Sequence, residues 1–351
     1  MKPSLCIINF NGTKILPAAL QAACSIADRF EAILVVDDCS TDGSVELVER
    51  QFPLVRVIRQ DRNQGPGAAR NTGIRQAPSD VIIVMDNDVA LTEGCVDHLV
   101  AALATHPRAV VAAPAVLYAH QRDTIQYDGA ECHFLGVQTL RDEDRPIEQV
   151  DQSVRNVGSL VSCCFAIDRS RQRPLELFDE SYFIYFEDHD FGWRLRALGA
   201  EVLSVPQARC FHGTGTEGLS IRQLGTYSSR RVFYLIRNRW LCILKNFSLR
   251  TLLVMLPLLV FYEGAQFAIV VKKGWLREWW RSVTWVGGHL PQVLRERRRI
   301  QRARRVPDRE LLMGGPVPFR RELSTSAIEV AARRLLDGVV QAYWKVAAVL
   351  I

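Results

Sequence analysis

The chain has 351 residues, of which 48% are hydrophobic and 23% charged, enough for one large domain with an appended segment. The formal net charge of +6 is modest but unevenly spread, because residues 295–305 contain seven arginines and one glutamate. No nucleic-acid motif accompanies this block and an apolar stretch lies just upstream. We therefore expect an anionic membrane surface as its partner and no nucleic acid, with a solvated helix face as the alternative.

The nine cysteines form no C-x-x-C pair and no zinc-type spacing with histidine. Scattered cysteines of this kind are typical of a reducing cytosol, where most act as small buried hydrophobic residues. The N-terminus runs directly into a predicted strand, with no basic segment or cleavage site before it. We therefore expect no secretory signal and a cytosolic first half.

Strands and helices alternate through the first half of the sequence. Strands are predicted at residues 5–9, 32–36, 55–59, 81–85 and 109–118, and helices at about 15–28, 45–51, 68–76 and 93–105. Residues 121–155 are polar and are expected to form hairpins and a loop. Further strands are predicted at 159–167 and 201–205, separated by a loop and a helix at 178–199 that ends at Gly199. This alternation with short connections predicts a doubly wound, largely parallel sheet.

The composition changes after about residue 220. Residues 226–245 form a basic, aromatic-rich helix, and residues 252–271 have about the length needed to cross a bilayer. Pro257 and Glu263 interrupt this apolar stretch, and basic clusters flank it on both sides, so no clear crossing is predicted. We expect an interfacial or re-entrant helix pair rimmed by Trp275, Trp279, Trp280 and Trp285, with a soluble helical hairpin as the alternative. Residues 326–351 form an amphipathic helix of uncertain partner.

Two carboxylates follow the apolar run at residues 81–85. Alternate strand residues point the same way, so Asp86 and Asp88 can share one target. Ligands of open α/β sheets bind outside the carboxyl ends of the strands. Paired carboxylates there suit a divalent cation that also holds substrate phosphates. A helix cap or a solvated loop is the alternative.

Other strand ends add to this constellation. Asp37 and Asp38 follow the second strand. Residues 63–73 (NQGPGAARNTG) place glycines before the N-terminus of a helix, which favours phosphate. Residues 187–190 form an acidic cluster. A doubly wound sheet with these features implies a nucleoside diphosphate ligand. Neither G-x-G-x-x-G after the first strand nor a P-loop motif is present, which argues against a dinucleotide enzyme and a P-loop NTPase.

At this point the sequence resembles glycosyltransferase family 2, with the GT-A fold, close to its bacterial rhamnosyltransferase-like members. The resemblance covers about residues 2–246 and rests on these segments: IINFNG at 7–12, VVDDCSTDGS at 35–44, NQGPGAARNTG at 63–73, VMDNDV at 84–89, FDESYFIYFEDHDFGWRLRALG at 178–199, FHGTGTEGLS at 211–220 and YLIRNRWLCILKN at 234–246. It implies a GT-A catalytic domain at residues 1–225, with a mixed α/β sheet, and a helical, membrane-associated region at 226–351.

The resemblance also implies which residues hold the donor. Asp37 or Asp38 would bond the uracil or thymine edge, the choice remaining open and a turn cap being the alternative for Asp38. Asn63, Gly65 and Arg70 match the loop that covers the nucleotide, and Asn9 joins the nucleotide-binding set. Asp88 would be the direct Mg²⁺ or Mn²⁺ ligand, Asp86 would contact the ribose or the metal's water, and His212 would contact the metal or the diphosphate.

The acidic cluster supplies the expected base. Asp188 matches the general base of inverting members, which takes the proton of the acceptor hydroxyl as it attacks the donor sugar. Glu187 and Asp190 are the next candidates for the base; alternatively, Glu187 would bind the acceptor and Asp190 would pair with Arg194. The alternative is that the cluster caps a helix beginning near Asp190.

These expectations describe an inverting, metal-dependent glycosyltransferase. It would transfer a sugar from a UDP- or dTDP-sugar, dTDP-rhamnose among them, to a saccharide or lipid-linked saccharide for cell-surface polysaccharide. It would act at the cytoplasmic face of the inner membrane as a peripheral or monotopic protein. Two alternatives stay open: a sugar-nucleotide pyrophosphorylase, and a catalytically silent membrane scaffold with the same fold.

Overall fold

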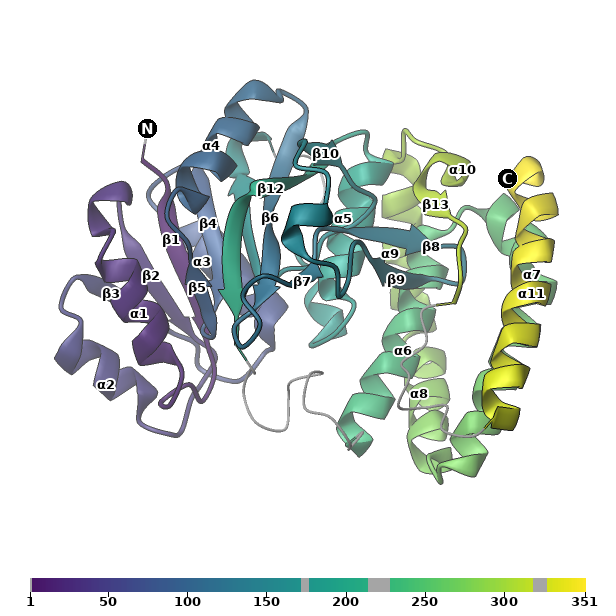
Figure 1. The fold of residues 1–351 in the computed structure, drawn as a ribbon. Helices are drawn as coiled ribbons and strands as arrows, with labels where there is room; N and C mark the ends of the chain where they lie inside the picture. The colour runs from purple at the N-terminus through teal and green to yellow at the C-terminus, as the bar shows by residue number, and fades with distance from the viewer. Residues whose placement is uncertain (1, 172–176, 214–227, 318–326) are drawn as a thin grey trace. The chain divides into compact units, whose positions relative to one another are not determined.

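The structure is a computed structural model that describes residues 2–171, 177–213, 228–317 and 327–351 (Figure 1). It divides into an α/β unit, made of Met1–Ala130 with Leu140–Leu224, and a helical unit, made of Glu131–Thr139 with Gly225–Ile351. The expected boundary at residue 225 and residues 214–220 of the FHGTGTEGLS segment lie outside the described residues.

The α/β unit is built on one large mixed sheet whose strand order is β10-β12-β6-β11-β4-β1-β2-β3. β1, β2, β3 and β4 pair in parallel, whereas β11 runs antiparallel to both β4 and β6. The strands are β1 (Ser4–Asn9), β2 (Ile33–Asp37), β3 (Val55–Arg59), β4 (Val81–Asp86), β5 (Val89–Leu91), β6 (Ala109–Tyr118), β7 (Ile125–Tyr127), β10 (Arg155–Asn156), β11 (Cys164–Asp168) and β12 (Glu201–His212).

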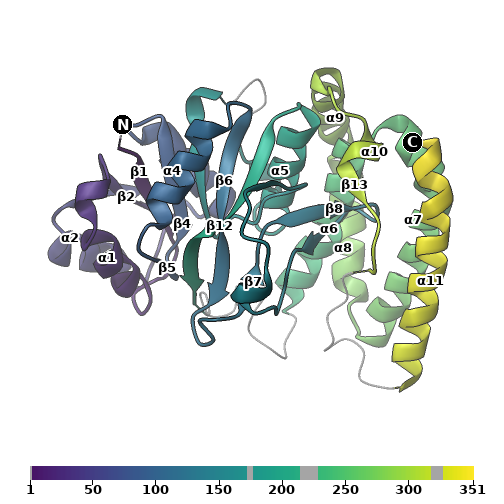
Figure 2. The same cartoon turned by 45° about the horizontal axis from the view of Figure 1, so that its top comes forward.

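Helices cover both faces of this sheet (Figure 2). They are α1 (Leu16–Cys24), α2 (Ser44–Gln51), α3 (Pro66–Gln76), α4 (Cys95–Thr105) and α5 (Glu187–Ala197). The period-two pattern of β1 explains the two layers: Leu5 and Ile7 join the core formed with α1 and α4, and Cys6 and Ile8 join the core formed with α3 and α5. Because both faces of the sheet are covered at β1, residues 5–8 of this strand form a continuous apolar run.

Several element bounds differ from the sequence expectations. α3 begins two residues earlier than predicted, because Pro66 occupies the first turn, where a missing N–H costs nothing. The strand expected at 159–167 begins only at Cys164, and the one expected at 201–205 continues to His212 through an irregularity between Val205 and Arg209. This continuation brings His212 opposite Val89, which places the end of β12 beside the end of β4.

The helical unit contains α6 (Ser229–Asn246), α7 (Leu249–Lys272), α8 (Leu276–Gly288), α9 (Leu290–Ala303), α10 (Asp308–Leu311) and α11 (Ala327–Leu350). Parts of β8 (Ala130–His133) and β9 (Val137–Leu140) form a small sheet with β13 (Leu312–Met313). α7 is continuous through Pro257. Of the tryptophans expected to rim this helix pair, Trp280 is exposed and Trp285 stacks on His289 beneath Arg237, and the rim itself stays a prediction.

Among the described residues, α7 is the one helix long and apolar enough to cross a bilayer, judged by length and composition. Only 28% of its most apolar window is buried, which distinguishes it from the core helix of a globular domain. Glu263, the residue that argued against a membrane element, forms an ion pair with Arg239 of α6. The charge that looked costly in the sequence is therefore neutralised within the helical unit.

Candidate active site

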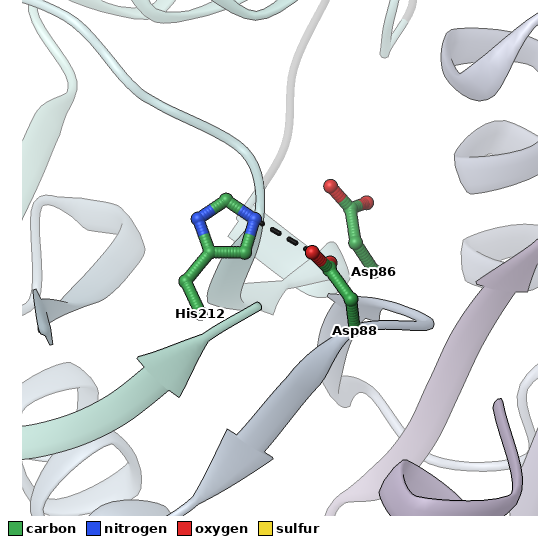
Figure 3. Close-up of side chains that lie close together, drawn as sticks. All are labelled: Asp86, Asp88 and His212. Atoms are coloured by element: carbon green, nitrogen blue, oxygen red, sulfur yellow. Dashed lines mark ion pairs between the residues drawn. The ribbon is translucent and has the colours of Figure 1, made fainter. Parts of the chain in front are cut away.

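Asp86, Asp88 and His212 meet at the ends of β4 and β12 (Figure 3). Each offers a ligand atom, and these atoms lie within 4.8 Å of one another. His212 Nε2 is buried and lies 3.4 Å from Asp88 Oδ1. Carboxylate oxygens together with an imidazole nitrogen fit a divalent cation. The sequence predicted all three residues, and the structure brings them together.

The other side of His212 is held by β7 and by the segment before β11. Its Nδ1 lies 2.8 Å from the Gln126 side-chain oxygen, and the thiol of Cys163 also contacts the ring. Burial lowers the pKa of His212, but the neighbouring Cys163 sulfur and the Asp88 carboxylate outweigh it and raise that pKa to about 9. Tyr127 donates a hydrogen bond of 2.7 Å to Cys163. The histidine is therefore fixed in orientation before any ligand binds.

Arg70 connects this cluster to the acidic start of α5. The guanidinium donates to Asp86 at 2.8 Å and to Glu187 at 3.1 Å, and the side chain is 4% exposed. Arg70 lies in α3, where a helix was predicted, and its side chain is in the protein interior; its role in covering the nucleotide stays a prediction. Burial of an arginine is tolerated only when carboxylates compensate it, and here two do.

Glu187 and Asp188 form the first turn of α5, so the helix starts earlier than the alternative of a cap near Asp190 assumed. Burial, followed by the charge of Asp188, raises the pKa of Glu187 to about 7. Burial likewise raises the pKa of Asp188, whose oxygens accept hydrogen bonds from the backbone N–H groups of His189 at 2.7 Å and Ser162 at 3.3 Å. Two coupled carboxyls with raised pKa values at a ligand site are typical of acid–base chemistry.

Asp190 and Arg194 form the ion pair expected from the family resemblance. Arg194 Nε donates to Asp190 at 2.7 Å, and Tyr182 donates to the other oxygen of Asp190 at 3.0 Å. Both charged side chains are buried. This pair holds α5 against the segment at 177–182, because Arg194 also donates to the Leu177 carbonyl at 2.6 Å.

The aspartates at the end of β2 are bonded within the protein. Asp37 accepts from the Asn9 side chain at 2.7 Å and from the Ser40 backbone at 2.8 Å. Asp38 accepts from the backbone N–H groups of Gln64 and Gly65, both at 2.8 Å, and burial raises its pKa to about 6. Asn9, which is fully buried, thus orients Asp37, whereas Asp38 fixes the loop that begins at Asn63.

Gly65 and a turn before α5 approach each other closely. Gly65 has φ +87°, and a Cβ there would lie 2.0 Å from the Phe183 carbonyl oxygen. Phe183 itself has φ 64° and ψ −66°, and Ile184 N–H bonds the Tyr182 carbonyl at 2.9 Å, which makes a strained γ-turn. The glycine-rich loop is thereby in contact with the chain that leads into Glu187 and Asp188.

Sequence reasoning missed Gln126, Cys163 and the Ser162 backbone N–H. Gln126 lies in the polar segment that gave no clear pattern, and Cys163 was grouped with the buried hydrophobic cysteines. The adjacent Cys163 and Cys164 were the one local signal, but nothing in the sequence connects them to a histidine 49 positions later.

Comparisons with known proteins agree with this geometry. The model of glycosyl transferase family 2 matches residues 4–170. The chain is 30% identical over 213 residues to the N-acetylglucosaminyl-diphospho-decaprenol L-rhamnosyltransferase of Mycobacterium tuberculosis, covering 54% of this chain and 69% of that protein. The chain belongs to glycosyltransferase family 2 and is an enzyme of the transferase class.

Two solved structures share the fold. GalNAc-T7 with UDP, GalNAc and Mn²⁺ superposes with a TM-score of 0.55 at 19% identity, over 69% of this chain and 47% of that one. The Pyrobaculum calidifontis mannosyltransferase PcManGT, in complex with GDP-Man and Mn²⁺, gives 0.50 at 15% identity, over 99% of this chain and 87% of that one. The α/β unit therefore has the expected GT-A fold.

Proposed function

We propose that this chain is an inverting, divalent-metal-dependent glycosyltransferase. Its donor would be a UDP- or dTDP-sugar, with dTDP-rhamnose a leading candidate, and its acceptor a lipid-linked saccharide in cell-surface polysaccharide synthesis. The observation that carries the proposal is the continuous set Asp86–Asp88–His212, joined through Arg70 to Glu187 and Asp188. The rhamnosyltransferase relative, named for a decaprenol-linked substrate, supports the choice of donor and acceptor.

In this mechanism the donor diphosphate lies at the ends of β4 and β12. Asp86, Asp88 and His212 would hold Mg²⁺ or Mn²⁺, which when bound neutralises charge on the departing nucleoside diphosphate. Asp37 and Asp38, with Asn63 and Gly65, would form the nucleoside end of the site.

Asp188 would take the proton of the acceptor hydroxyl as that oxygen attacks the anomeric carbon and the bond to the diphosphate breaks. The backbone N–H groups of His189 and Ser162 hold its carboxylate in place. Glu187 would contact the acceptor. Arg70 holds Glu187 and Asp86 in place through its hydrogen bonds to both carboxylates. No covalent intermediate is required, because one displacement inverts the anomeric centre.

Lipid-linked acceptors are carried by membranes, so we propose a peripheral or monotopic position at the cytoplasmic face of the inner membrane. The apolar helix α7 and the arginines of α9 support this position.

The test is a panel of UDP-, dTDP- and GDP-sugars with a lipid-linked saccharide and Mn²⁺ or Mg²⁺. Transfer should occur from a UDP- or dTDP-sugar, and proton NMR of the product should show the inverted anomer. Asp188→Asn should abolish transfer while nucleotide-sugar affinity, measured by calorimetry, stays nearly unchanged. Full activity of Asp188→Asn would show that the base is another residue, with Glu187→Gln as the next variant. Pyrophosphate release from a nucleoside triphosphate and a sugar phosphate would favour the pyrophosphorylase instead.

A further inference from the structure

One side of α7 exposes an apolar stripe along the whole helix. Its members recur every three, four or seven residues and so share one face. Their exposed fractions run from 38% to 65%, and they are Leu249, Leu253, Leu256, Val260, Phe267 and Val271. The opposite face is packed inside the helical unit through Met255, Leu258 and Tyr262. The stripe therefore has no partner within the described part of the chain.

α11 lies alongside α7 and exposes apolar side chains of its own (Figures 1 and 2). The Tyr343 hydroxyl donates to the Val254 carbonyl at 2.6 Å. Leu335, Val339, Val346 and Val349 of α11 are exposed by 43% to 81%. Exposed apolar side chains gathered on neighbouring helices mark an interaction site. We call the exposed apolar side chains of α7 and α11 the α7–α11 face.

The helical unit also carries exposed basic side chains. Arg250, Lys273 and Arg277 are exposed near the two ends of α7. On α9, Arg295, Arg298, Arg299 and Arg302 line a surface hollow of about 490 Å³. Arg297 of the same run instead donates hydrogen bonds to the Leu244 and Phe247 carbonyls at 2.7 and 2.6 Å. Some of the seven arginines therefore face solvent, whereas Arg297 holds α9 against α6.

We propose that the α7–α11 face inserts into the interfacial layer of an anionic bilayer, with the exposed α9 arginines on lipid phosphates. This proposal rests on the proposed function, because it names the surface that brings the enzyme to its acceptor. A one-sided stripe on a helix that packs against its own protein is typical of a helix lying in the interface, and α7 is about 36 Å long.

A second copy of the chain fits this face less well than a bilayer. A twofold interface brings identical patches together. The basic ends of α7 would then approach their own copies, and like charges oppose such a contact. Lipid phosphates, by contrast, attract each of these groups, at about 1 kcal/mol per Lys or Arg near the surface.

The test is co-sedimentation of the full chain with vesicles of phosphatidylcholine alone and with added phosphatidylglycerol. We expect binding to the mixed vesicles, and at least about tenfold weaker binding for the double variant Leu253→Gln/Val260→Gln, since two apolar side chains lose their buried position. Arg298→Glu/Arg302→Glu should weaken binding to the anionic vesicles selectively. Leu54→Gln, which changes an equally exposed apolar residue of the α/β unit, is the matched control and should bind normally.

Unchanged binding of Leu253→Gln/Val260→Gln, verified as folded by circular dichroism, would overturn the proposal. So would a lipid-free dimer, seen by light scattering, that this variant abolishes, because the face would then belong to a second copy. Sugar transfer is measured separately. Active enzyme that ignores vesicles overturns this inference alone, whereas vesicle binding without any transfer overturns the proposed function alone.

A second inference comes from the hydrogen bond between Gln126 and His212. The amide oxygen of Gln126 can only accept, so the 2.8 Å contact places the imidazole proton on Nδ1. When the imidazole is neutral, as a metal ligand must be, the lone pair is on Nε2, which faces Asp88. Such a partner on the far nitrogen commonly fixes the tautomer and orientation of a metal-binding histidine.

We infer that Gln126 is the positioning residue that makes His212 a cation ligand and thereby favours Mn²⁺ over Mg²⁺. Imidazole suits transition metals, whereas Mg²⁺ prefers oxygen ligands only. The inference rests on the proposed function. It decides between Mg²⁺ and Mn²⁺, a choice that two aspartate ligands alone leave open.

The test measures Mn²⁺ binding to the purified chain by electron paramagnetic resonance, with Mg²⁺ as competitor. Gln126→Leu should weaken Mn²⁺ binding about 10- to 100-fold and lower the Mn²⁺/Mg²⁺ selectivity, the usual effect of losing such a partner. Gln126→Glu keeps a hydrogen-bond acceptor and should retain most of the Mn²⁺ affinity and of the Mn²⁺/Mg²⁺ selectivity. Gln76→Leu, at an exposed position, should change neither the affinity nor the selectivity. Selectivity unchanged in Gln126→Leu would overturn the inference, while loss of sugar transfer with normal Mn²⁺ binding would count only against the proposed function.

Discussion

The two units of this protein share one departure from the usual distribution of residues and differ in a second. Both bury charge: Arg70 and Glu187 of the α/β unit are nearly inaccessible, and so are Arg239 and Lys245 of the helical unit. Only the helical unit exposes apolar side chains along whole helices, α7 and α11. Buried charge and exposed apolar surface are the two informative exceptions to ordinary burial. In the α/β unit the buried charges lie where a polar ligand would bind, and in the helical unit the exposed apolar side chains lie where an apolar environment would cover them.

The largest expected effect tests the polar cluster directly. Asp88→Ala should lower the rate of sugar transfer by on the order of 10³-fold, because a bound divalent cation supplies several kcal/mol of charge stabilisation. Initial rates and Mn²⁺ binding should fall together. Asp97→Ala removes an exposed aspartate that pairs with Arg29 and should leave both unchanged. Normal Mn²⁺ binding by Asp88→Ala would break the assignment of this cluster.

Arg70 tests whether buried charge is compensated. Arg70→Ala leaves Asp86 and Glu187 without their cation and should lower the free energy of unfolding by about 3–5 kcal/mol at pH 8. The loss should shrink as the pH falls, since protonation of carboxyls with pKa values of about 6 and 7 removes the uncompensated charge. Urea unfolding at pH 8 and pH 5 measures this. The exposed Arg75→Ala in the same helix should change stability by no more than about 0.5 kcal/mol.

Gly65 tests the contact between the glycine-rich loop and the turn at Phe183. Gly65→Ala combines a positive φ with a backbone clash and should destabilise the fold by about 1–3 kcal/mol. Gly43 also has a positive φ, +78°, but nothing lies within 4 Å of its would-be Cβ, so Gly43→Ala should cost about 1–2 kcal/mol or less. Equal losses in urea unfolding would mean that the approach to Phe183 contributes nothing.

Glu187 tests the coupling of the two carboxyls at the start of α5. The base must be ionised, so kcat/KM should fall as the pH drops through the raised pKa of Asp188. The charge of Asp188 in turn helps to raise the pKa of Glu187, so Asp188→Asn should lower the pKa of Glu187. A carbon-13 NMR titration of the Glu187 carboxyl measures this shift. A pKa of Glu187 that rises, or stays the same, would contradict the interaction between the two carboxyls.

The smallest expected effect concerns the exposed face of α7. Leu253→Gln should change the free energy of unfolding in lipid-free buffer by no more than about 0.5 kcal/mol, because the side chain is already exposed. Leu258→Ala, on the packed side of the same helix, should cost about 2–5 kcal/mol. Similar losses for both would mean that the exposed stripe is covered in solution, and the contrast between the two units would weaken.

Much of the α/β unit could be predicted because its signals are local. Period-two apolar strands ending on acids placed Asp86 and Asp88 at a ligand edge, and the family motifs added His212 and Asp188. The role of Arg70 could not be predicted, because its two partners lie 16 and 117 residues away. In the helical unit the composition of each helix was evident but its neighbours were not: nothing local indicated that Glu263 would pair with Arg239 or that α11 would lie alongside α7.

The sequence by itself determined the family, the alternation of strands and helices, and the residue types that can bind a cation and a nucleoside diphosphate. These features are visible in the sequence because the residues that form a strand end or a glycine turn are consecutive in the chain. Only the tertiary structure decided which charges compensate each other, that Asp38 holds a loop, that Gln126 orients His212, and which sides of α7 and α11 are exposed. These are contacts between segments distant in the chain, and burial and hydrogen-bond geometry exist only once those segments have packed.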